Sequence, residues 1–191
     1  MRHEILSGCP IVRADLARRG LRVNTLSEMA ARGVLYRVSR GVYASYVGAE
    51  SGLLDYELAS RVVPRGVFTL LSALRLHALT DENPQKMSMA IPLKSHPPKT
   101  TLAMDFVYMK PELLAMDVVE MDSNGTTLHV FTVERTIAEC FKHRNRIGIS
   151  VAVSALQEAV KKRTLDLARL GRTLVECRMF RIAQPYLEGI A

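Results

Sequence analysis

Residues 24–43 change from a helical to a strand pattern, and this change limits the folds that the chain can adopt. In the segment NTLSEMAARG, Leu26, Met29 and Ala30 follow the i, i+3, i+4 spacing of one helix face, and a glycine ends the pattern. The segment GVLYRVSRGVY then alternates apolar and polar residues around a Ser-Arg-Gly turn, in which Gly41 can adopt a positive φ. The sequence therefore predicts a short helix followed directly by a hairpin.

A second helical pattern precedes this pair of elements. In PIVRADLARRG, Pro10 is placed to start a helix and Gly20 to end it. Helix, tight turn, helix and basic hairpin is the order of a winged helix-turn-helix. Because only MRHEILS comes before the pair, we expect either a short additional helix there or a later helix, SGLLDYELASRVV, that covers the open apolar face.

A winged helix-turn-helix places the N-terminal end of its second helix in the major groove and uses the hairpin as a wing. Arg37 and Arg40 would then lie along the phosphate backbone, or Arg40 would enter the minor groove. The candidate DNA-binding residues are Arg13, Arg22, Asn24, Thr25, Ser27, Glu28, Arg32, Arg37, Ser39 and Arg40. A small module for protein contacts is the alternative, but a polar helix face and a basic wing favour nucleic acid.

Charge is unevenly distributed along the chain, whose net charge is +7. Residues 1–47 contain eight arginines and three acidic residues, whereas residues 48–140 contain eight basic and twelve acidic residues. Residues 141–181 contain ten basic and three acidic residues. Two basic ends around an acidic middle indicate two separate anion-binding surfaces, unless each basic segment only solubilises the protein.

The rest of the chain predicts a second, α+β domain, so we expect a winged helix-turn-helix over residues 1–47 and an α+β domain over residues 48–191. Helices are expected in SGLLDYELASRVV, with Ser51 as cap, and from Phe68 to Leu79. KMSMAIPL and MDFVYMK are strand-like, and Asn124-Gly125 between two alternating runs predicts a hairpin. Three helices follow, in VERTIAECFKHR, GISVAVSALQEAVKKR and TLDLARLGRTLVECRMFRIAQPYL.

Several of these segments together resemble one known family. GVLYRVSRGVY, PRGVFTLLSALRLHALTD, AIP, FTVERTIAECFKHR and the late PYL are similar to segments of the AbiEi-type antitoxins of type IV toxin–antitoxin (abortive-infection) systems, and the resemblance runs from about Ile11 to Leu187. It implies an N-terminal winged helix-turn-helix that represses its own operon at inverted repeats in the promoter DNA. It also implies a C-terminal domain that counters a nucleotidyltransferase toxin without a stable complex.

By this resemblance Arg37 and Arg40 match the wing arginines, and Arg135 and Thr136 match the ERT core of the C-terminal domain. The chain departs from the family in its short N-terminus and in Glu139, where many relatives carry Asp. From the residues alone, Glu134 and Arg135 are better explained as an acid at a helix start and an arginine–acid bridge that ties helix to sheet.

Motifs for catalysis and for metal binding are missing from the sequence. Ser72, His77 and Asp81 could be drawn as a hydrolase trio, but no G-x-S-x-G surrounds Ser72, and we expect His77 to be a packed or capping residue. The five histidines form no H-x-x-x-H or H-x-H pair, and no nucleotide-binding, E-x-K nuclease or paired-aspartate nucleotidyltransferase motif occurs. We therefore expect no enzyme, no cofactor and no metal.

Three further expectations concern the environment of the protein. The odd, widely spaced cysteines, Cys9, Cys140 and Cys177, indicate reduced structural thiols. No apolar stretch is long enough for a membrane helix, and the N-terminus lacks a signal-peptide core. These features predict a cytoplasmic protein.

The prediction for function is a non-enzymatic DNA-binding repressor, an autoregulating antitoxin whose partners are promoter DNA and a nucleotidyltransferase toxin. Lys161, Lys162 and Arg163, at the end of an amphipathic helix, are the candidate antitoxin surface; DNA, RNA and an acidic protein are all possible ligands of the basic C-terminal segment. The alternatives are a stand-alone winged-helix transcription factor with a sensing or dimerising C-terminal domain, and an enzyme with a helix-turn-helix targeting module.

Overall fold

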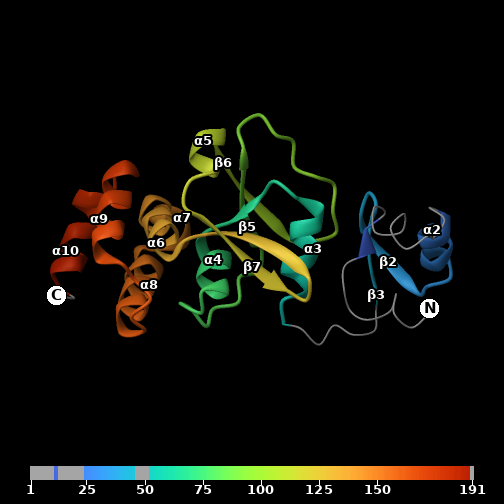
Figure 1. Cartoon of the computed structure of the whole chain (residues 1–191), viewed down its shortest axis with the longest axis horizontal. Coiled ribbons are helices and arrows are strands. Elements are labelled where there is room, and N and C mark those ends of the chain that lie inside the picture. The colour runs from blue at the N-terminus through green and yellow to red at the C-terminus, as the bar shows by residue number, and fades with distance from the viewer. Residues whose placement is uncertain (1–10, 13–23, 46–51, 190–191) are drawn as a thin grey trace. The chain divides into compact units, whose positions relative to one another are not determined.

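The computed structural model describes residues 11–12, 24–45 and 52–189, which form an α+β protein with two compact units (Figure 1). In the described part of the chain, the first unit contains the residues up to 66, together with 94–103 and 120–128. The second unit contains residues 67–93, 104–119 and 129 onward. The first unit thus extends beyond residue 47. The predicted boundary at residue 47 concerns DNA binding rather than compactness, and it stays a prediction.

The first unit is built from short elements around one small sheet. They are β1 (Ile11–Val12), α2 (Asn24–Ala31), β2 (Leu35–Ser39), β3 (Val42–Ser45) and α3 (Leu54–Val62). The three strands are antiparallel in the order β1-β3-β2. Gly33 and Gly41 have φ values of +71° and +80°, so each glycine supplies the left-handed conformation that ends α2 or closes the hairpin.

Both faces of the hairpin are covered by apolar side chains. On one face, Leu35 and Tyr43 pack with Ile11 of β1 and Leu26 of α2. On the other face, a second cluster contains Val38, Val42, Ala44 and Leu58, with Leu54, Val62 and Leu102 packed against it. Leu54, Leu58 and Val62 form the apolar stripe of α3, so this helix covers that face of the hairpin. The other expected possibility, a short helix in MRHEILS, lies outside the described residues.

The tip of a distant hairpin also belongs to the first unit. Ser123 and Asn124 donate hydrogen bonds of 2.7 and 2.8 Å from Oγ and Nδ2 to Oε1 of the buried Glu57 on α3. Ser60 Oγ donates to the carbonyl of Thr127 at 2.7 Å. These bonds fix α3 against residues more than sixty positions away in the sequence.

A five-stranded mixed sheet provides most of the strands of the second unit, although residues 120–128 of its β7–β8 hairpin belong to the first. Its strands are β4 (Val67–Phe68), β5 (Met87–Pro92), β6 (Met104–Met109), β7 (Val118–Ser123) and β8 (Thr126–Phe131), in the order β6-β5-β4-β8-β7. β5 pairs with β6 and β4 with β8 in parallel, while β4 and β5 are antiparallel. The expected hairpin at Asn124-Gly125 is confirmed, with φ values of +49° and +75°.

Helices pack against this sheet and against one another. They are α4 (Leu70–Leu76), α5 (Pro111–Leu114), α6 (Val133–Lys142), α7 (Arg144–Ile147), α8 (Ile149–Lys161), α9 (Leu167–Glu176) and α10 (Phe180–Glu188). Helix α6 is buried along almost its whole length, and α4, α8 and α9 all contact it. The predicted apolar face of α8 is confirmed, because Ala152, Leu156 and Ala159 lie in the core.

Several predicted boundaries are wrong. Ile11 and Val12 form a strand where the sequence predicts the start of a helix; the rest of that helix lies outside the described residues, as does Ser51. Phe68 is likewise a strand residue, because it pairs with Met89 and Val130 before α4 begins. The single long helix predicted at the C-terminus is two helices, because Arg178 takes a left-handed φ of +59° between α9 and α10.

Candidate nucleic-acid interface

Helix α2 has one buried and one polar face. Leu26 is the buried residue, with Met29 and Ala30 packed beside it. Asn24, Glu28 and Arg32 are exposed, and their spacing places them along one side of the helix and its end. The side of α2 that faces solvent therefore offers amide, carboxylate and guanidinium groups to a ligand.

Two other predicted contacts on α2 are less accessible. Thr25 is half-buried, and Ser27 Oγ lies 3.5 Å from the hydroxyl of the buried Tyr43. Ser27 thus helps to hold α2 on β3, although its side chain remains at the surface. The candidates Arg13 and Arg22 lie outside the described residues.

The β2–β3 hairpin carries the two predicted wing arginines, Arg37 within β2 and Arg40 in the turn. Both Arg37 and Arg40 are exposed, and Arg37 Nε donates a 3.3 Å hydrogen bond to the carbonyl of Ser39. Among the described residues, neither guanidinium forms an ion pair with a carboxylate. The hairpin therefore presents two positive charges that no carboxylate of the described residues neutralises.

A loop that the sequence analysis did not assign to the interface lies against this tip. Residues 94–103, here called the 94–103 loop, place Thr100 beside Ser39 in an antiparallel bridge. Ser39 Oγ donates a hydrogen bond to the carbonyl of Lys99 at 2.8 Å. The hydroxyl of Ser39, a predicted DNA contact, therefore uses its hydrogen to hold the loop. The hairpin and the loop enclose a groove with a volume of about 800 Å³, lined by Arg37, Val38, Ser39, Arg40, Val62, Pro98, Lys99, Thr100 and Thr101.

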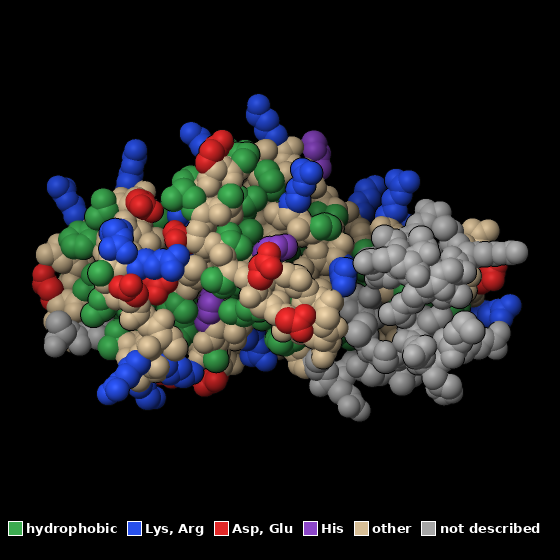
Figure 2. All heavy atoms as spheres, in the orientation of Figure 1, with side chains coloured by type: hydrophobic (Ala, Val, Ile, Leu, Met, Phe, Trp, Pro, Cys, Tyr) green, Lys and Arg blue, Asp and Glu red, His purple; other side chains and the backbone are tan. Residues whose placement is uncertain are grey.

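The second predicted surface lies at the end of α8. Lys161, Lys162 and Arg163 are all exposed, as expected for residues off the apolar face of the helix. The ammonium groups of Lys161 and Lys162 lie 3.5 and 3.4 Å from carboxylate oxygens of Glu158, and the pKa of Glu158 is lowered chiefly by its hydrogen bond with Lys162. Lys162 also donates to the carbonyl of Ala78. Lys161 and Arg163 are therefore more available to a ligand than Lys162. Figure 2 shows Lys and Arg side chains spread over the visible surface and around the outline of the molecule.

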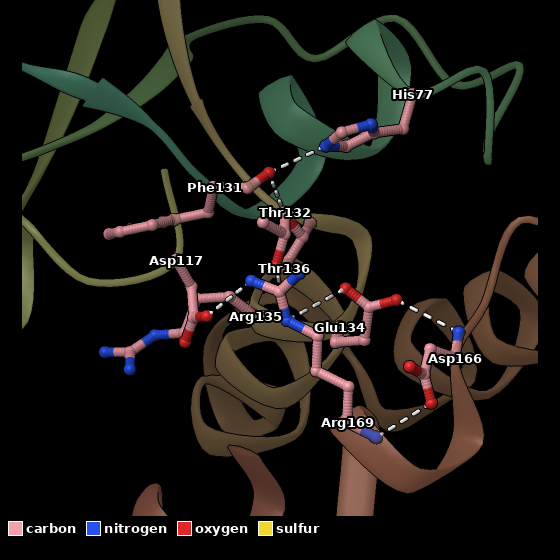
Figure 3. Close-up of polar contacts among 9 residues, drawn as sticks. All are labelled: His77, Asp117, Phe131, Thr132, Glu134, Arg135, Thr136, Asp166 and Arg169. Atoms are coloured by element: carbon pink, nitrogen blue, oxygen red, sulfur yellow. Dashed lines mark hydrogen bonds and ion pairs between the residues drawn. The ribbon is translucent and has the colours of Figure 1, made fainter. Parts of the chain in front are cut away.

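The ERT segment is a structural junction at the start of α6. Thr132 caps the helix by accepting a 3.3 Å hydrogen bond from the Arg135 amide, and Thr136 Oγ1 donates to the carbonyl of Phe131 (Figure 3). The guanidinium of Arg135 lies over the Phe131 ring, 5.4 Å from its centroid. The acidic partner of Arg135 is Glu139 of the same helix, at 2.9 Å. The prediction that this arginine–acid bridge ties the helix to the sheet is therefore wrong.

Glu134 joins two helices rather than facing a ligand. It accepts a 3.1 Å hydrogen bond from the Asp166 amide at the start of α9 (Figure 3). Arg169 lies between carboxylates, with Nη2 2.7 Å from Asp117 and Nε 3.9 Å from Glu134. These contacts connect α6, α9 and the residue before β7.

Glu139 is a fully buried carboxylate with three basic neighbours. Burial would raise the pKa of Glu139, but His143, Lys142 and Arg135 together hold it below its ordinary value. Cys177 Sγ lies 4.0 Å from Oε1 of the same carboxylate. Cys140 and Cys177 are free thiols, and burial raises the pKa of both; Cys9 lies outside the described residues.

The drawn hydrolase trio is not assembled in the structure. The buried Ser72 Oγ accepts a 2.8 Å hydrogen bond from the Ser88 amide, and His77 Nε2 lies 2.7 Å from the carbonyl of Phe131 (Figure 3). Burial lowers the pKa of His77, while that carbonyl and Glu134 act to raise it. His77 is thus a packed residue that joins α4 to the end of β8, as expected.

Within the described residues, no group of three or more His, Cys, Asp or Glu side chains could hold a metal ion, and no helix is long and apolar enough to cross a membrane. No protein-family model matches the chain, and a search of curated proteins found no match either.

Proposed function

We propose that this protein is a transcriptional repressor that binds double-stranded promoter DNA through a winged helix-turn-helix in its first unit. Helix α2 would enter the major groove, and the β2–β3 hairpin would contact the backbone as the wing. The observation that carries this proposal is the combination of a polar α2 face with two exposed arginines, on the hairpin that directly follows it, that form no ion pair with any carboxylate among the described residues. The apolar residues of both elements are used in packing, so the surface left for a ligand is polar and cationic.

The chemistry of the exposed groups divides them into two roles. Asn24 and Glu28 can read base edges, because an amide pairs with adenine and a carboxylate accepts from cytosine. Arg32, Arg37 and Arg40 suit phosphate, because a guanidinium offers several donors and a permanent charge. Phosphate contacts position the protein, and base contacts specify the sequence.

Binding to a duplex from the promoter of the protein's own gene tests the proposal. Phosphate neutralisation releases counterions, so log K should fall against log salt with a slope of about −0.9 for each phosphate contacted. Fluorescence anisotropy of the labelled duplex, recorded between roughly 50 and 300 mM salt, measures this slope. Salt-independent binding, or no binding, would overturn the proposal.

The second unit is proposed to be the antitoxin part, acting in the cytoplasm on a nucleotidyltransferase toxin. This part of the proposal is supported by the sequence resemblance and by the exposed Lys161 and Arg163 on α8. Co-expression with a nucleotidyltransferase encoded beside the gene tests it: survival should require this chain. If no such toxin is neutralised while promoter binding persists, the stand-alone transcription factor is the better explanation.

A further inference from the structure

The 94–103 loop is fixed to the wing by hydrogen bonds of residues 99–101. Thr100 Oγ1 and the Thr101 amide donate to the carbonyl of Val38, at 3.1 and 3.0 Å. Ser39 Oγ donates to the carbonyl of Lys99 at 2.8 Å. All three bonds join the loop to the last residues of β2, beside the turn that carries Arg40.

Apolar packing and proline stiffness add to this attachment. Leu102 packs against the cluster formed by Val38, Val42 and Leu58, which anchors the C-terminal part of the loop. Pro97 and Pro98 precede Lys99, and the fixed φ of proline reduces the conformations that this stretch can adopt. The backbone of Lys99 is therefore held at the wing tip before any ligand binds.

The groove between wing and loop is lined by three cationic side chains and, among the described residues, by no acidic one. Its lining includes Arg37 and Arg40 from the hairpin and Lys99 from the loop. All three side chains belong to exposed residues, and in the described part of the chain none of them is paired with a carboxylate. Three like charges held around one groove repel one another, so an anion seated there relieves that repulsion.

We infer that Lys99, Arg37 and Arg40 form one phosphate-binding clamp, so that the wing engages the DNA backbone with a lysine from the 94–103 loop as well as its own arginines. This inference rests on the proposed function and deepens it, because it places part of the DNA-binding surface outside residues 1–47. A backbone phosphate fits the groove, since phosphate accepts several charge-assisted hydrogen bonds at once. Duplex DNA is favoured over an acidic protein segment because the polar face of α2 belongs to the same unit.

The test is Lys99→Ala in the full chain, measured by anisotropy against a promoter duplex and a scrambled duplex. Loss of one phosphate contact should reduce the salt slope by about 0.9, which corresponds to about fivefold weaker binding at 0.15 M salt. Both duplexes should lose affinity equally, because a phosphate contact carries no sequence information. Lys94→Ala is the matched control: Lys94 is exposed on the same loop but does not line the groove. This control should leave the slope unchanged.

Every other outcome contradicts either the clamp or the proposed DNA-binding function on which it rests. If Arg40→Ala weakens binding and Lys99→Ala does not, the wing binds DNA without the loop. The clamp is then wrong, whereas the proposed DNA-binding function stands. If Lys94→Ala matches Lys99→Ala, net charge rather than the groove is responsible. If Lys99→Ala affects only binding of polyglutamate, the groove takes an acidic protein segment. If the wild-type chain binds neither duplex, the proposed function itself fails.

Discussion

At the residue scale, charged groups in the second unit are divided between buried junctions and exposed clusters. Arg135 and Glu139 are both buried, with 2% and 0% of their side chains exposed, and they pair at 2.9 Å. Lys161 and Lys162 pair with Glu158 at the surface, where solvent weakens the attraction. The same type of ion pair therefore has different consequences at the two places.

We predict that Glu139→Gln strongly destabilises the fold. The amide keeps the shape of the side chain but leaves Arg135 as a buried charge without its partner, which costs about 3–5 kcal/mol. Glu158→Gln, at the surface pair, should change stability little. Urea denaturation of both variants measures the difference; equal stabilities would mean that the Arg135–Glu139 pair is solvated.

The pKa of Glu139 also predicts how the protein responds to acid. Because its folded-state pKa lies below the ordinary value of 4.5, ionised Glu139 contributes stability that is present above that value. The contribution is lost as the pH falls below 4.5 and through the folded-state pKa. Acid titration followed by circular dichroism should show wild type losing more stability than Glu139→Gln.

His77 gives a prediction at higher pH. Its folded-state pKa lies below 6.5, so the folded protein favours the neutral ring, which can donate from Nε2 to Phe131. Stability from this residue is full above pH 6.5 and declines as the pH falls below it. Comparing the thermal midpoints of wild type and His77→Gln between about pH 8 and 5 isolates this effect from the other histidines. A constant difference between them would contradict it.

At the element scale, the β7–β8 turn shows how local sequence and distant packing act together. Asn124 and Gly125 both adopt positive φ, which the Asn-Gly pair favours by itself. The Asn124 amide then donates to the buried Glu57 of α3, a partner that only the folded chain provides. The turn is thus both a local signal and an attachment point for α3.

Replacing two glycines by alanine should have opposite effects. Gly125 has a φ of +75°, so Gly125→Ala should destabilise by about 1–2 kcal/mol because of steric strain at Cβ. Gly171 lies inside α9, and a Cβ there meets no heavy atom within 4 Å; Gly171→Ala should stabilise by about 0.5–1 kcal/mol. Urea denaturation gives both values, and the same sign for both would contradict the assignment.

At the scale of the whole molecule, the two basic surfaces belong to different compact units and can be altered separately. Arg37→Ala with Arg40→Ala should abolish promoter binding and leave toxin neutralisation intact. Lys161→Glu with Arg163→Glu should impair neutralisation while promoter binding persists. Lys162 is left unchanged because its ammonium group contacts Glu158 and Ala78.

Both outputs are measured for both double variants, with circular dichroism as the folding control. If the α8 variant also loses promoter affinity, its basic end is a second DNA-binding surface. If both folded variants lose both functions, the division of labour between the two units is wrong.

The sequence by itself determined the elements whose signals are local. Helical spacing predicted α2 and α8, and alternation around Ser-Arg-Gly and Asn-Gly predicted the two hairpins. Glycine supplies the positive φ that these turns require. The exposure of Arg40 also followed from its place at the tip of the hairpin. These features depend on neighbours within a few residues, so the sequence pattern contains the information.

Only the tertiary structure decided the features that depend on partners far away in the chain. Ile11–Val12 is a strand because β3 offers a pairing edge, although the local pattern resembles a helix start. The sequence predicts that Arg135 bridges the helix to the sheet, but packing of α4, α8 and α9 around α6 buries it beside Glu139 of the same helix. Lys99 and Thr100 lie against the β2–β3 hairpin because hydrogen bonds with Ser39 and Val38 close a separation of about sixty residues, and no short-range pattern encodes that contact.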